Sequence, residues 1–294
     1  MSDSMLKNTL TRWAFWSILT VLPVAGATSI SFATEIVAHR GASYDAPENT
    51  LASVNLAWEQ KADAVEIDVY LTKDGKIVLM HDRTPKRYGG PDTPVESMTW
   101  DELKGLDVGA WKDPKFKGIT PPLLEDVVKN IPDGKRLFIE IKSGPEIVPE
   151  LKRVLKAANR PAAQTAVISF NQQVIERTVK EIPEIQAYWV LSMEDKNKNL
   201  VDVNWVISTA KKIKTHGVDI GGKTARITPE FVKAIHDEGI PVYVWTVNDP
   251  AEAERIAAMG VLGITTDRPG LLREHGIGNY TSANIHIPSQ SSAK

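Results

Sequence analysis

The stretch that decides the fold runs from Glu35 to Asp82 and reads EIVAHRGASYDAPENTLASVNLAWEQKADAVEIDVYLTKDGKIVLMHD. Its apolar start ends in His39-Arg40-Gly41, so a short strand is expected to deliver an imidazole and a guanidinium at its carboxyl end. Asn49 or Thr50 can cap the helix that follows, in which apolar and polar positions fall on different faces. A strand followed by an amphipathic helix is typical of α/β folds.

The next apolar segment is expected to form a second strand that carries two acidic residues. Glu66 and Asp68 stand two residues apart, so the pleat of the strand points both carboxylates to the same side, where one cation can sit between them. The turn signal Lys73-Asp74-Gly75 predicts that the chain then folds back as a hairpin. This hairpin returns His81 toward Glu66, where it can face His39 across a metal ion.

Strands and helices alternate through the rest of the chain, after an irregular excursion. Residues 83–122 contain several glycines and prolines and one short predicted helix near 100–106, which indicates a small insertion that builds one wall of the site. Including the strands that begin at 35 and 64, about eight parallel strands with helical crossovers predict a (β/α)8 TIM barrel. The later strands are expected at residues 137–142, 166–170, 186–191, 218–220, 242–246 and 262–266, and the first two helices after the excursion at 124–131 and 146–158.

Composition limits the class of protein. The 294 residues are 42% hydrophobic and 24% charged, with a formal net charge of -2, which suits a globular chain with one barrel of roughly 250 residues. Neither the charge nor its distribution provides the basic stripe of a nucleic-acid-binding protein, so no nucleic-acid partner is expected.

The first 33 residues do not belong to the predicted barrel. Lys7 and Arg12 precede an uncharged apolar run at 13–22, and small residues follow. This pattern predicts a secretory signal peptide over residues 1–33 and export through a bacterial inner membrane, to the periplasm or to the medium. The alternative is an uncleaved N-terminal membrane anchor, because no charge stands between Arg12 and Glu35.

The predicted domain organisation is simple. The barrel spans residues 34–278, and residues 279–294, rich in Ser, Asn and Pro, are predicted to be a disordered tail. The chain has no cysteine, which excludes a disulfide and a lipid anchor on Cys, so an exported chain is held by its core alone. We expect no stable membrane insertion of the mature chain, and the oligomeric state is not predicted.

A third strand adds a further carboxylate to the predicted site. Glu140 and Lys142 stand two apart at the end of that strand, which places both above the barrel beside Glu66 and Asp68. Three carboxylates, with no cysteine and no clustered histidine triad, favour Ca²⁺ or Mg²⁺ over zinc. The alternative is an ion-paired barrel interior, in which these carboxylates pair with Arg40 and Lys142.

The ordered set of motifs closely resembles the glycerophosphodiester phosphodiesterase family. The resemblance covers roughly residues 35–274; each motif alone is weak, but the ordered set is highly specific. It implies a TIM-barrel enzyme that uses a metal ion to hydrolyse glycerophosphodiesters, such as glycerophosphocholine, to sn-glycerol 3-phosphate and an alcohol. The matching motifs are His39-Arg40-Gly41, Pro47-Glu48-Asn49-Thr50, Glu66-Ile67-Asp68, His81-Asp82, Leu106-Asp107-Val108-Gly109-Ala110-Trp111, Pro122-Leu123-Leu124-Glu125, Glu140-Ile141-Lys142, Ile168-Ser169-Phe170, Val244-Trp245-Thr246-Val247-Asn248 and Ile264-Thr265-Thr266-Asp267.

The resemblance also assigns roles. Phosphodiester cleavage needs one proton removed from the attacking oxygen and another delivered to the leaving oxygen, and imidazole is suited to both near neutral pH. The histidines that match the family's general acid and base are His39 and His81. Arg40 and Lys142 are expected to hold the non-bridging phosphate oxygens. Which histidine is the acid, and whether water or the glycerol 2-hydroxyl attacks, is not predicted; the second route passes through a cyclic phosphate.

Four further residues are predicted around this site. Glu48 and Asn49 are expected to tie the first loop to the site, Glu48 through Arg40 or a histidine. Phe170 and Trp245, at the ends of later strands, are expected to line the alcohol or glycerol pocket, with a core role as the alternative. The other nearby polar residues and histidines are interpreted as structural: Asp82, Thr266, Asp267, His216, His236, His275 and His286.

Two other functions remain open on the sequence. The same barrel and histidine pair also resemble phosphatidylinositol-cleaving phospholipases and sphingomyelinase D-like enzymes, which act on intact lipid; an exposed apolar rim near the site would favour them. A binding protein that captures phosphodiesters without cleaving them predicts loss of a histidine or a carboxylate, and none of these residues is missing.

Overall fold

A closed parallel barrel forms the body of the protein. The computed structural model describes residues 32–278 and 281–282. Eight parallel strands follow one another around the barrel. In spatial order these strands are β2 (Glu35–Ala38), β10 (Gly263–Thr266), β9 (Val242–Val244), β8 (Gly217–Gly221), β7 (Gln186–Ser192), β6 (Thr165–Ser169), β5 (Arg136–Ile141) and β3 (Ala64–Leu71). The pairing of β2 with β3 closes the barrel, which confirms the predicted (β/α)8 fold.

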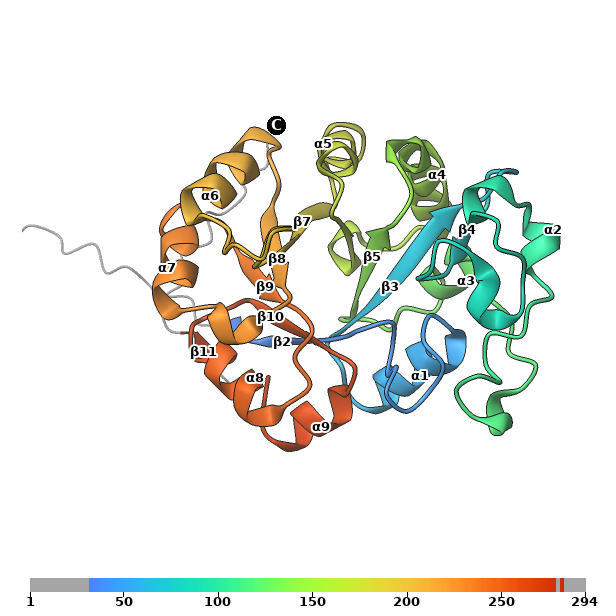
Figure 1. Cartoon of the computed structure of the whole chain (residues 1–294), viewed down its shortest axis with the longest axis horizontal. Coiled ribbons are helices and arrows are strands. Elements are labelled where there is room, and N and C mark those ends of the chain that lie inside the picture. The colour runs from blue at the N-terminus through green and yellow to red at the C-terminus, as the bar shows by residue number, and fades with distance from the viewer. Residues whose placement is uncertain (1–31, 279–280, 283–294) are drawn as a thin grey trace, which may run out of the picture.

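Helices cover the outside of the barrel, as Figure 1 shows. Many of them begin at a residue whose side chain accepts a hydrogen bond from the first turn, and Thr50, not Asn49, has this role in the first helix. The helices are α1 (Leu51–Glu59), α3 (Leu124–Val128), α4 (Val148–Ala158), α5 (Gln172–Glu181), α6 (Val203–Lys212), α7 (Pro229–Asp237), α8 (Pro250–Ala257) and α9 (Pro269–Glu274).

Aromatic side chains fill the middle of the barrel interior. Phe138, Tyr188 and Tyr243 pack together with ring centroids 5.1–5.9 Å apart. Gly263 makes room for this packing, because a Cβ at that position would lie 2.4 Å from the Tyr243 ring. Aromatic side chains therefore fill the middle of the barrel, and the cavity at the carboxyl ends of the strands lies above them.

The insertion after β3 forms a small lobe at the right of Figure 1. The predicted hairpin is confirmed, since β4 (Ile77–Leu79) pairs antiparallel with β3. The short helix predicted at 100–106 is α2 (Trp100–Leu103), which ends two residues before Gly105. Trp100 packs in the apolar cluster of this lobe, whereas Trp111 is 42% exposed.

Two helix boundaries differ from the predicted ones for local reasons. The helix expected at 124–131 ends at Val128, because Pro132 disfavours the α conformation at the residue before it. The helix expected at 146–158 begins with a 3-10 turn, η4 (Pro145–Ile147), before α4.

The described ends of the chain meet. β1 (Phe32–Ala33) pairs antiparallel with β11 (Thr281–Ser282). These four residues belong to the segments assigned above to the leader and the tail; the other residues of both segments lie outside the described part of the chain. None of the described helices is long and apolar enough to cross a membrane.

Candidate active site

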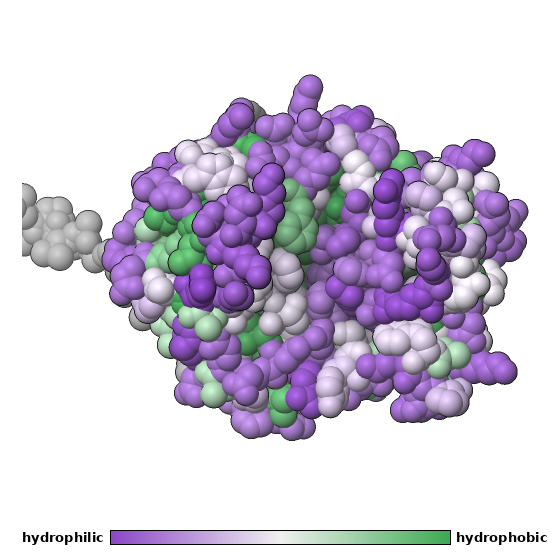
Figure 2. Space-filling view, in the orientation of Figure 1, coloured by the Kyte–Doolittle hydropathy of each residue, from purple (hydrophilic) through white to green (hydrophobic). Residues whose placement is uncertain are grey.

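Most of the predicted residues line one cavity at the carboxyl ends of the barrel strands, and Asp68, Glu48 and Asn49 lie behind its wall, in contact with Arg40 or with one another. The cavity has a volume of about 190 Å³. Figure 2 shows a hollow near the middle of this face, with hydrophilic surface on one side and paler, more hydrophobic residues on the other. The residues that line the cavity are His39, Arg40, Glu66, His81, Glu140, Lys142, Ile168, Phe170, Val190, Asp219, Trp245 and Thr265.

The three predicted carboxylates form one buried cluster. Glu66, Asp68 and Glu140 each place an oxygen within 4.8 Å of the others, and the three residues are at most 8% exposed. Arg40 Nε lies 3.1 Å from Asp68 Oδ2, and Lys142 Nζ lies 2.8 Å from Glu140 Oε1 and 3.4 Å from Asp68 Oδ1. The ion pairs of the alternative interpretation therefore exist beside the carboxylate cluster.

These ion pairs leave the cluster incompletely satisfied. Among the described residues, the buried oxygens Glu66 Oε1 and Asp68 Oδ1 have no hydrogen-bond partner. Burial, together with the charges of Asp68 and Glu140, raises the pKa of Glu66 well above its usual range. Burial and the Asp68 charge also raise the pKa of Glu140 to about 7. Crowded carboxylate oxygens without a hydrogen-bond partner fit a hard divalent cation that takes oxygen ligands.

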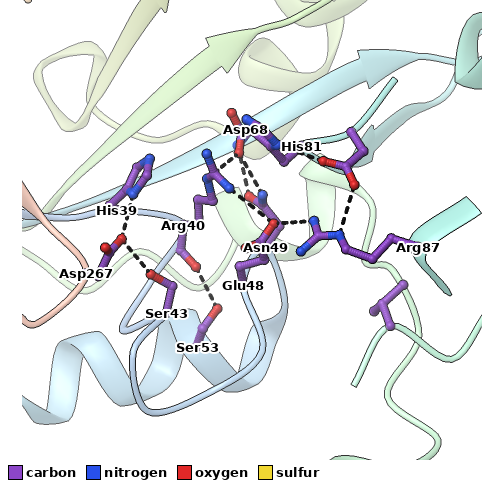
Figure 3. Close-up of polar contacts among 12 residues, drawn as sticks. His39, Arg40, Ser43, Glu48, Asn49, Ser53, Asp68, His81, Arg87 and Asp267 are labelled. Atoms are coloured by element: carbon purple, nitrogen blue, oxygen red, sulfur yellow. Dashed lines mark hydrogen bonds and ion pairs between the residues drawn. The ribbon is translucent and has the colours of Figure 1, made fainter. Parts of the chain in front are cut away.

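His39 is held by a carboxylate from the far end of the sequence. Its Nδ1 lies 2.7 Å from Asp267 Oδ1, and Asp267 also accepts a hydrogen bond from Ser43 (Figure 3). Asn248 donates a further hydrogen bond to Asp267 Oδ2 at 2.6 Å. Although burial opposes it, hydrogen bonding from His39 and these neighbours lowers the pKa of Asp267 to about 2. Because Nδ1 is engaged, Nε2 is the nitrogen left for a substrate.

His81 is oriented in the same way and belongs to a longer network. Its Nδ1 lies 2.9 Å from Asp82 Oδ1, and Asp82 Oδ2 accepts a hydrogen bond from Arg87 Nε at 2.9 Å. Arg87 also donates to Glu48 Oε1 at 2.6 Å, and Arg40 donates to the same oxygen at 3.2 Å (Figure 3). The network thus connects the predicted phosphate-binding arginine to the second histidine, and Glu48 reaches Arg40 as expected.

Asn49 locks the first loop onto β3. Its amide donates to Asp68 Oδ2 at 2.8 Å, and its carbonyl oxygen accepts from the Asp68 backbone N–H at 2.9 Å. Arg40 and Asn49 both have a φ of 56°, and Gly41 has a φ of 81°. A Cβ at Gly41 would lie 2.5 Å from Ser53, so only glycine fits this turn.

Phe170 and Trp245 form an aromatic wall of the cavity. Their ring centroids are 5.6 Å apart in an edge-to-face arrangement, and Phe170 is 46% exposed, which excludes a core role for it. Gly221 admits the indole, because a Cβ there would lie 2.2 Å from the Trp245 ring. The Trp245 Nε1–H donates to the backbone oxygen of Asp219 at 3.2 Å.

Comparison with known proteins agrees with this arrangement. The sequence profile of the glycerophosphoryl diester phosphodiesterase family matches residues 39–271. The chain belongs to this family. A glycerophosphodiester phosphodiesterase of Caldanaerobacter subterraneus is 33% identical over 243 residues, which are 81% of this chain and 96% of the relative. One of Bacillus subtilis is 29% identical over 255 residues, 81% of this chain and 85% of the relative.

Solved structures of the family share the barrel. The structure of an Oleispira antarctica phosphodiesterase, in complex with the product sn-glycerol-3-phosphate, has a TM-score of 0.74 and 28% identity, and covers 83% of this chain and 96% of its own. A glycerophosphodiester phosphodiesterase from Agrobacterium tumefaciens has a TM-score of 0.68 and 28% identity, and covers 82% of this chain and 99% of its own.

For this member of the glycerophosphoryl diester phosphodiesterase family, sequence reasoning missed several contacts of the site. Asp82 and Asp267 were interpreted only as structural, yet each holds a candidate catalytic histidine, and Arg87 and Asp219 were not singled out. A signal existed for Asp267: in a closed barrel the first and last strands are neighbours, so the residue after β10 lies beside the residue after β2.

The remaining histidines of the described residues lie away from the cavity. His216 Nδ1 accepts a hydrogen bond from the Ala187 backbone N–H, and His275 lies at the end of α9 with Nδ1 2.9 Å from Leu271 O. His236 lies in the last turn of α7, although its Nε2 is buried without a hydrogen-bond partner among the described residues. His286 lies outside the described residues.

Proposed function

We propose that this family member hydrolyses glycerophosphodiesters to sn-glycerol 3-phosphate and an alcohol, with a divalent cation and with His39 and His81 as general acid and base. The observation that carries the proposal is the joint placement, at one cavity, of two imidazoles with carboxylate partners and a carboxylate cluster with partnerless oxygens. Figure 3 shows the two histidines on either side of Arg40.

Each residue has a separate task. Glu66, Asp68 and Glu140 would hold Ca²⁺ or Mg²⁺, which when bound supplies a positive charge that polarises the phosphoryl group and helps to position the attacking oxygen. Arg40 and Lys142 bind the non-bridging oxygens by charge-assisted hydrogen bonds.

The histidines move the protons. One imidazole removes the proton from the attacking oxygen, which belongs to water or to the glycerol 2-hydroxyl, and the other protonates the leaving oxygen. Asp267 and Asp82 accept the Nδ1 protons, so that Nε2 of each ring faces the phosphodiester, without a proton in the base and with one in the acid. Attack by the 2-hydroxyl would form a cyclic phosphate that water then opens.

A solved structure of a similar protein supports the proposed small-molecule substrate. The Oleispira antarctica phosphodiesterase was solved with sn-glycerol-3-phosphate as its product. All the histidines and carboxylates of the motifs are present in the site, which speaks against a protein that only binds phosphodiesters.

We also propose that residues 1–33 direct export, so that the enzyme acts in the periplasm or in the medium. The Lys7 and Arg12 charges before the apolar run support this proposal. Cell fractionation with N-terminal sequencing of the recovered protein tests it: a start near residue 34 supports cleavage, and an intact N-terminus in the membrane fraction supports the anchor.

The activity test uses the purified full-length chain, first chelated and then supplied with Ca²⁺ or Mg²⁺. Release of sn-glycerol 3-phosphate from glycerophosphocholine or glycerophosphoethanolamine that depends on the added ion supports the proposal. Ion-independent release would refute the role of the cation. No release from either compound, together with cleavage of intact phospholipid or sphingomyelin, would move the chain to the lipid-cleaving alternatives.

A further inference from the structure

Asp219 is a buried acid of the cavity that the proposed reaction does not use. It lies in the middle of β8, is 4% exposed and lines the cavity beside Ile168, Val190 and Trp245. Its Oδ1 is buried and has no hydrogen-bond partner among residues 32–278. An unpaired buried polar group destabilises a protein, so its presence in a cavity calls for a ligand that pairs with it.

The position of Asp219 separates it from the carboxylate cluster. The oxygens that converge within 4.8 Å of one another come from Glu66, Asp68 and Glu140, not from Asp219. Arg40 and Lys142 pair with that cluster, and Asp219 is in no ion pair of the described chain. Asp219 is therefore suited neither to the cation site nor to the phosphate-binding residues.

The surroundings of Asp219 indicate the chemistry of its ligand. Phe170 and Trp245 line the same cavity with apolar surface that suits carbon atoms, and Asp219 is a polar group among apolar neighbours. Burial, with a smaller contribution from the Glu140 charge, raises the pKa of Asp219 to about 8. A protonated carboxyl group both donates and accepts hydrogen bonds, as does an alcohol hydroxyl.

We propose that Asp219 binds a hydroxyl group of the glycerol moiety and makes the cavity select polyol phosphodiesters over simple alkyl phosphodiesters. This inference rests on the proposed function, since it assumes that the phosphate lies against Arg40 and Lys142. A site built to hydrogen-bond a hydroxyl rejects an analogue that lacks it, because its own buried polar group is then left unpaired.

The experiment compares the binding of two ligands by the cation-loaded enzyme. Calorimetry measures the affinities for sn-glycerol 3-phosphate and for n-propyl phosphate, which has the same carbon chain without hydroxyls. The wild type is expected to bind sn-glycerol 3-phosphate about tenfold more tightly, the size of one good hydrogen bond to a buried group. Asp219→Leu is expected to reduce this preference to about twofold or less, and Asp219→Asn, which still donates and accepts, to retain most of it.

Stability measurements separate a binding role from a structural one. Asp219→Leu removes a partnerless polar group, so its melting temperature is expected to equal or exceed that of the wild type. The matched control is Asp202→Leu, which removes the cap of α6 and should lower the melting temperature without changing the ligand preference.

The experiments distinguish failure of the role of Asp219 from failure of the proposed function. An unchanged preference in Asp219→Leu, or loss of its folding, overturns the role of Asp219 and leaves the proposed function in place if the wild type still turns over glycerophosphocholine. A wild type that releases no sn-glycerol 3-phosphate overturns the proposed function, and this inference with it.

Discussion

The two ends of the barrel bury charged groups in opposite ways. At the amino end, Glu35 Oε2 accepts hydrogen bonds from Arg136 Nη1 and from the Tyr243 hydroxyl, both at 2.8 Å. Arg136 also donates to Tyr243 at 3.0 Å, and its guanidinium lies 4.7 Å from the Phe138 ring centroid. None of the partnerless buried atoms found in the described chain belongs to these residues.

The carboxyl end leaves its buried charges partly unpaired. Partnerless oxygens occur there on Glu66, Asp68 and Asp219, although basic side chains lie close by. The cluster at the amino end is therefore a structural element whose polar groups satisfy one another, whereas the cluster at the carboxyl end leaves buried oxygens without a hydrogen bond, as the proposed binding of a cation and a substrate requires. This division agrees with the general location of activity in such barrels.

The largest expected effect is on catalysis at the carboxyl end. Replacing His39 or His81 with Ala should lower kcat by about 10²–10⁴, because a positioned acid or base is lost, while cation binding and the melting temperature change little. Steady-state kinetics and calorimetric titration measure both. His275→Ala, at the end of α9, is the control, and a double-digit percentage of residual activity in either variant would contradict the acid-base role.

The next effect is on cation affinity. Replacing Glu66, Asp68 or Glu140 with Ala should weaken binding of Ca²⁺ or Mg²⁺ by roughly tenfold or more, because each removes an oxygen ligand. Calorimetric titration checks each variant against Glu150→Ala on α4, and unchanged binding removes that residue from the ligand set. In chelator, Glu66→Gln should melt at or above the wild-type temperature, since it relieves repulsion in the crowded cluster.

A variant at the amino end should have the opposite result. Glu35→Leu removes the oxygen that accepts hydrogen bonds from Arg136 and Tyr243, leaves both donors without it, and should lower the free energy of unfolding by about 1–3 kcal/mol, with kcat changed less than twofold. Urea denaturation and steady-state kinetics measure the two effects. A stability equal to that of the wild type, or a large loss of kcat, would erase the contrast between the two ends.

The smallest expected effect concerns acid stability at Asp267. The pKa of Asp267 is lowered to about 2 from a usual 3.8. Its contribution to the free energy of unfolding is therefore complete above about pH 4 and is lost as the pH falls toward 2. Allowing for partial exposure, this contribution is about 1–2 kcal/mol. The difference in unfolding free energy between the wild type and Asp267→Asn should therefore narrow between pH 5 and pH 2.5, and a constant difference would contradict the assignment.

Much of the fold could be predicted from the order of side chains. The alternation of apolar segments identified the strands and helices, because each pattern reflects which face of an element is buried. The spacing of two residues between Glu66 and Asp68 predicted that they share a face, and they do share one cluster. Boundaries near Pro132 and Gly105 were less accurate, since local breakers compete with periodicity there.

The sequence by itself determined the barrel, the family and the candidate residues for the chemistry, because strand periodicity and motif spacing are local properties of the chain. Only the tertiary structure decided which groups support them: Asp267 reaches His39 across 228 residues, and Arg87 reaches Glu48 across 39. It also decided which buried oxygens, such as Asp219 Oδ1, lack a partner. Such contacts depend on how the barrel closes and on the path of an irregular insertion, and neither has a local pattern in the sequence.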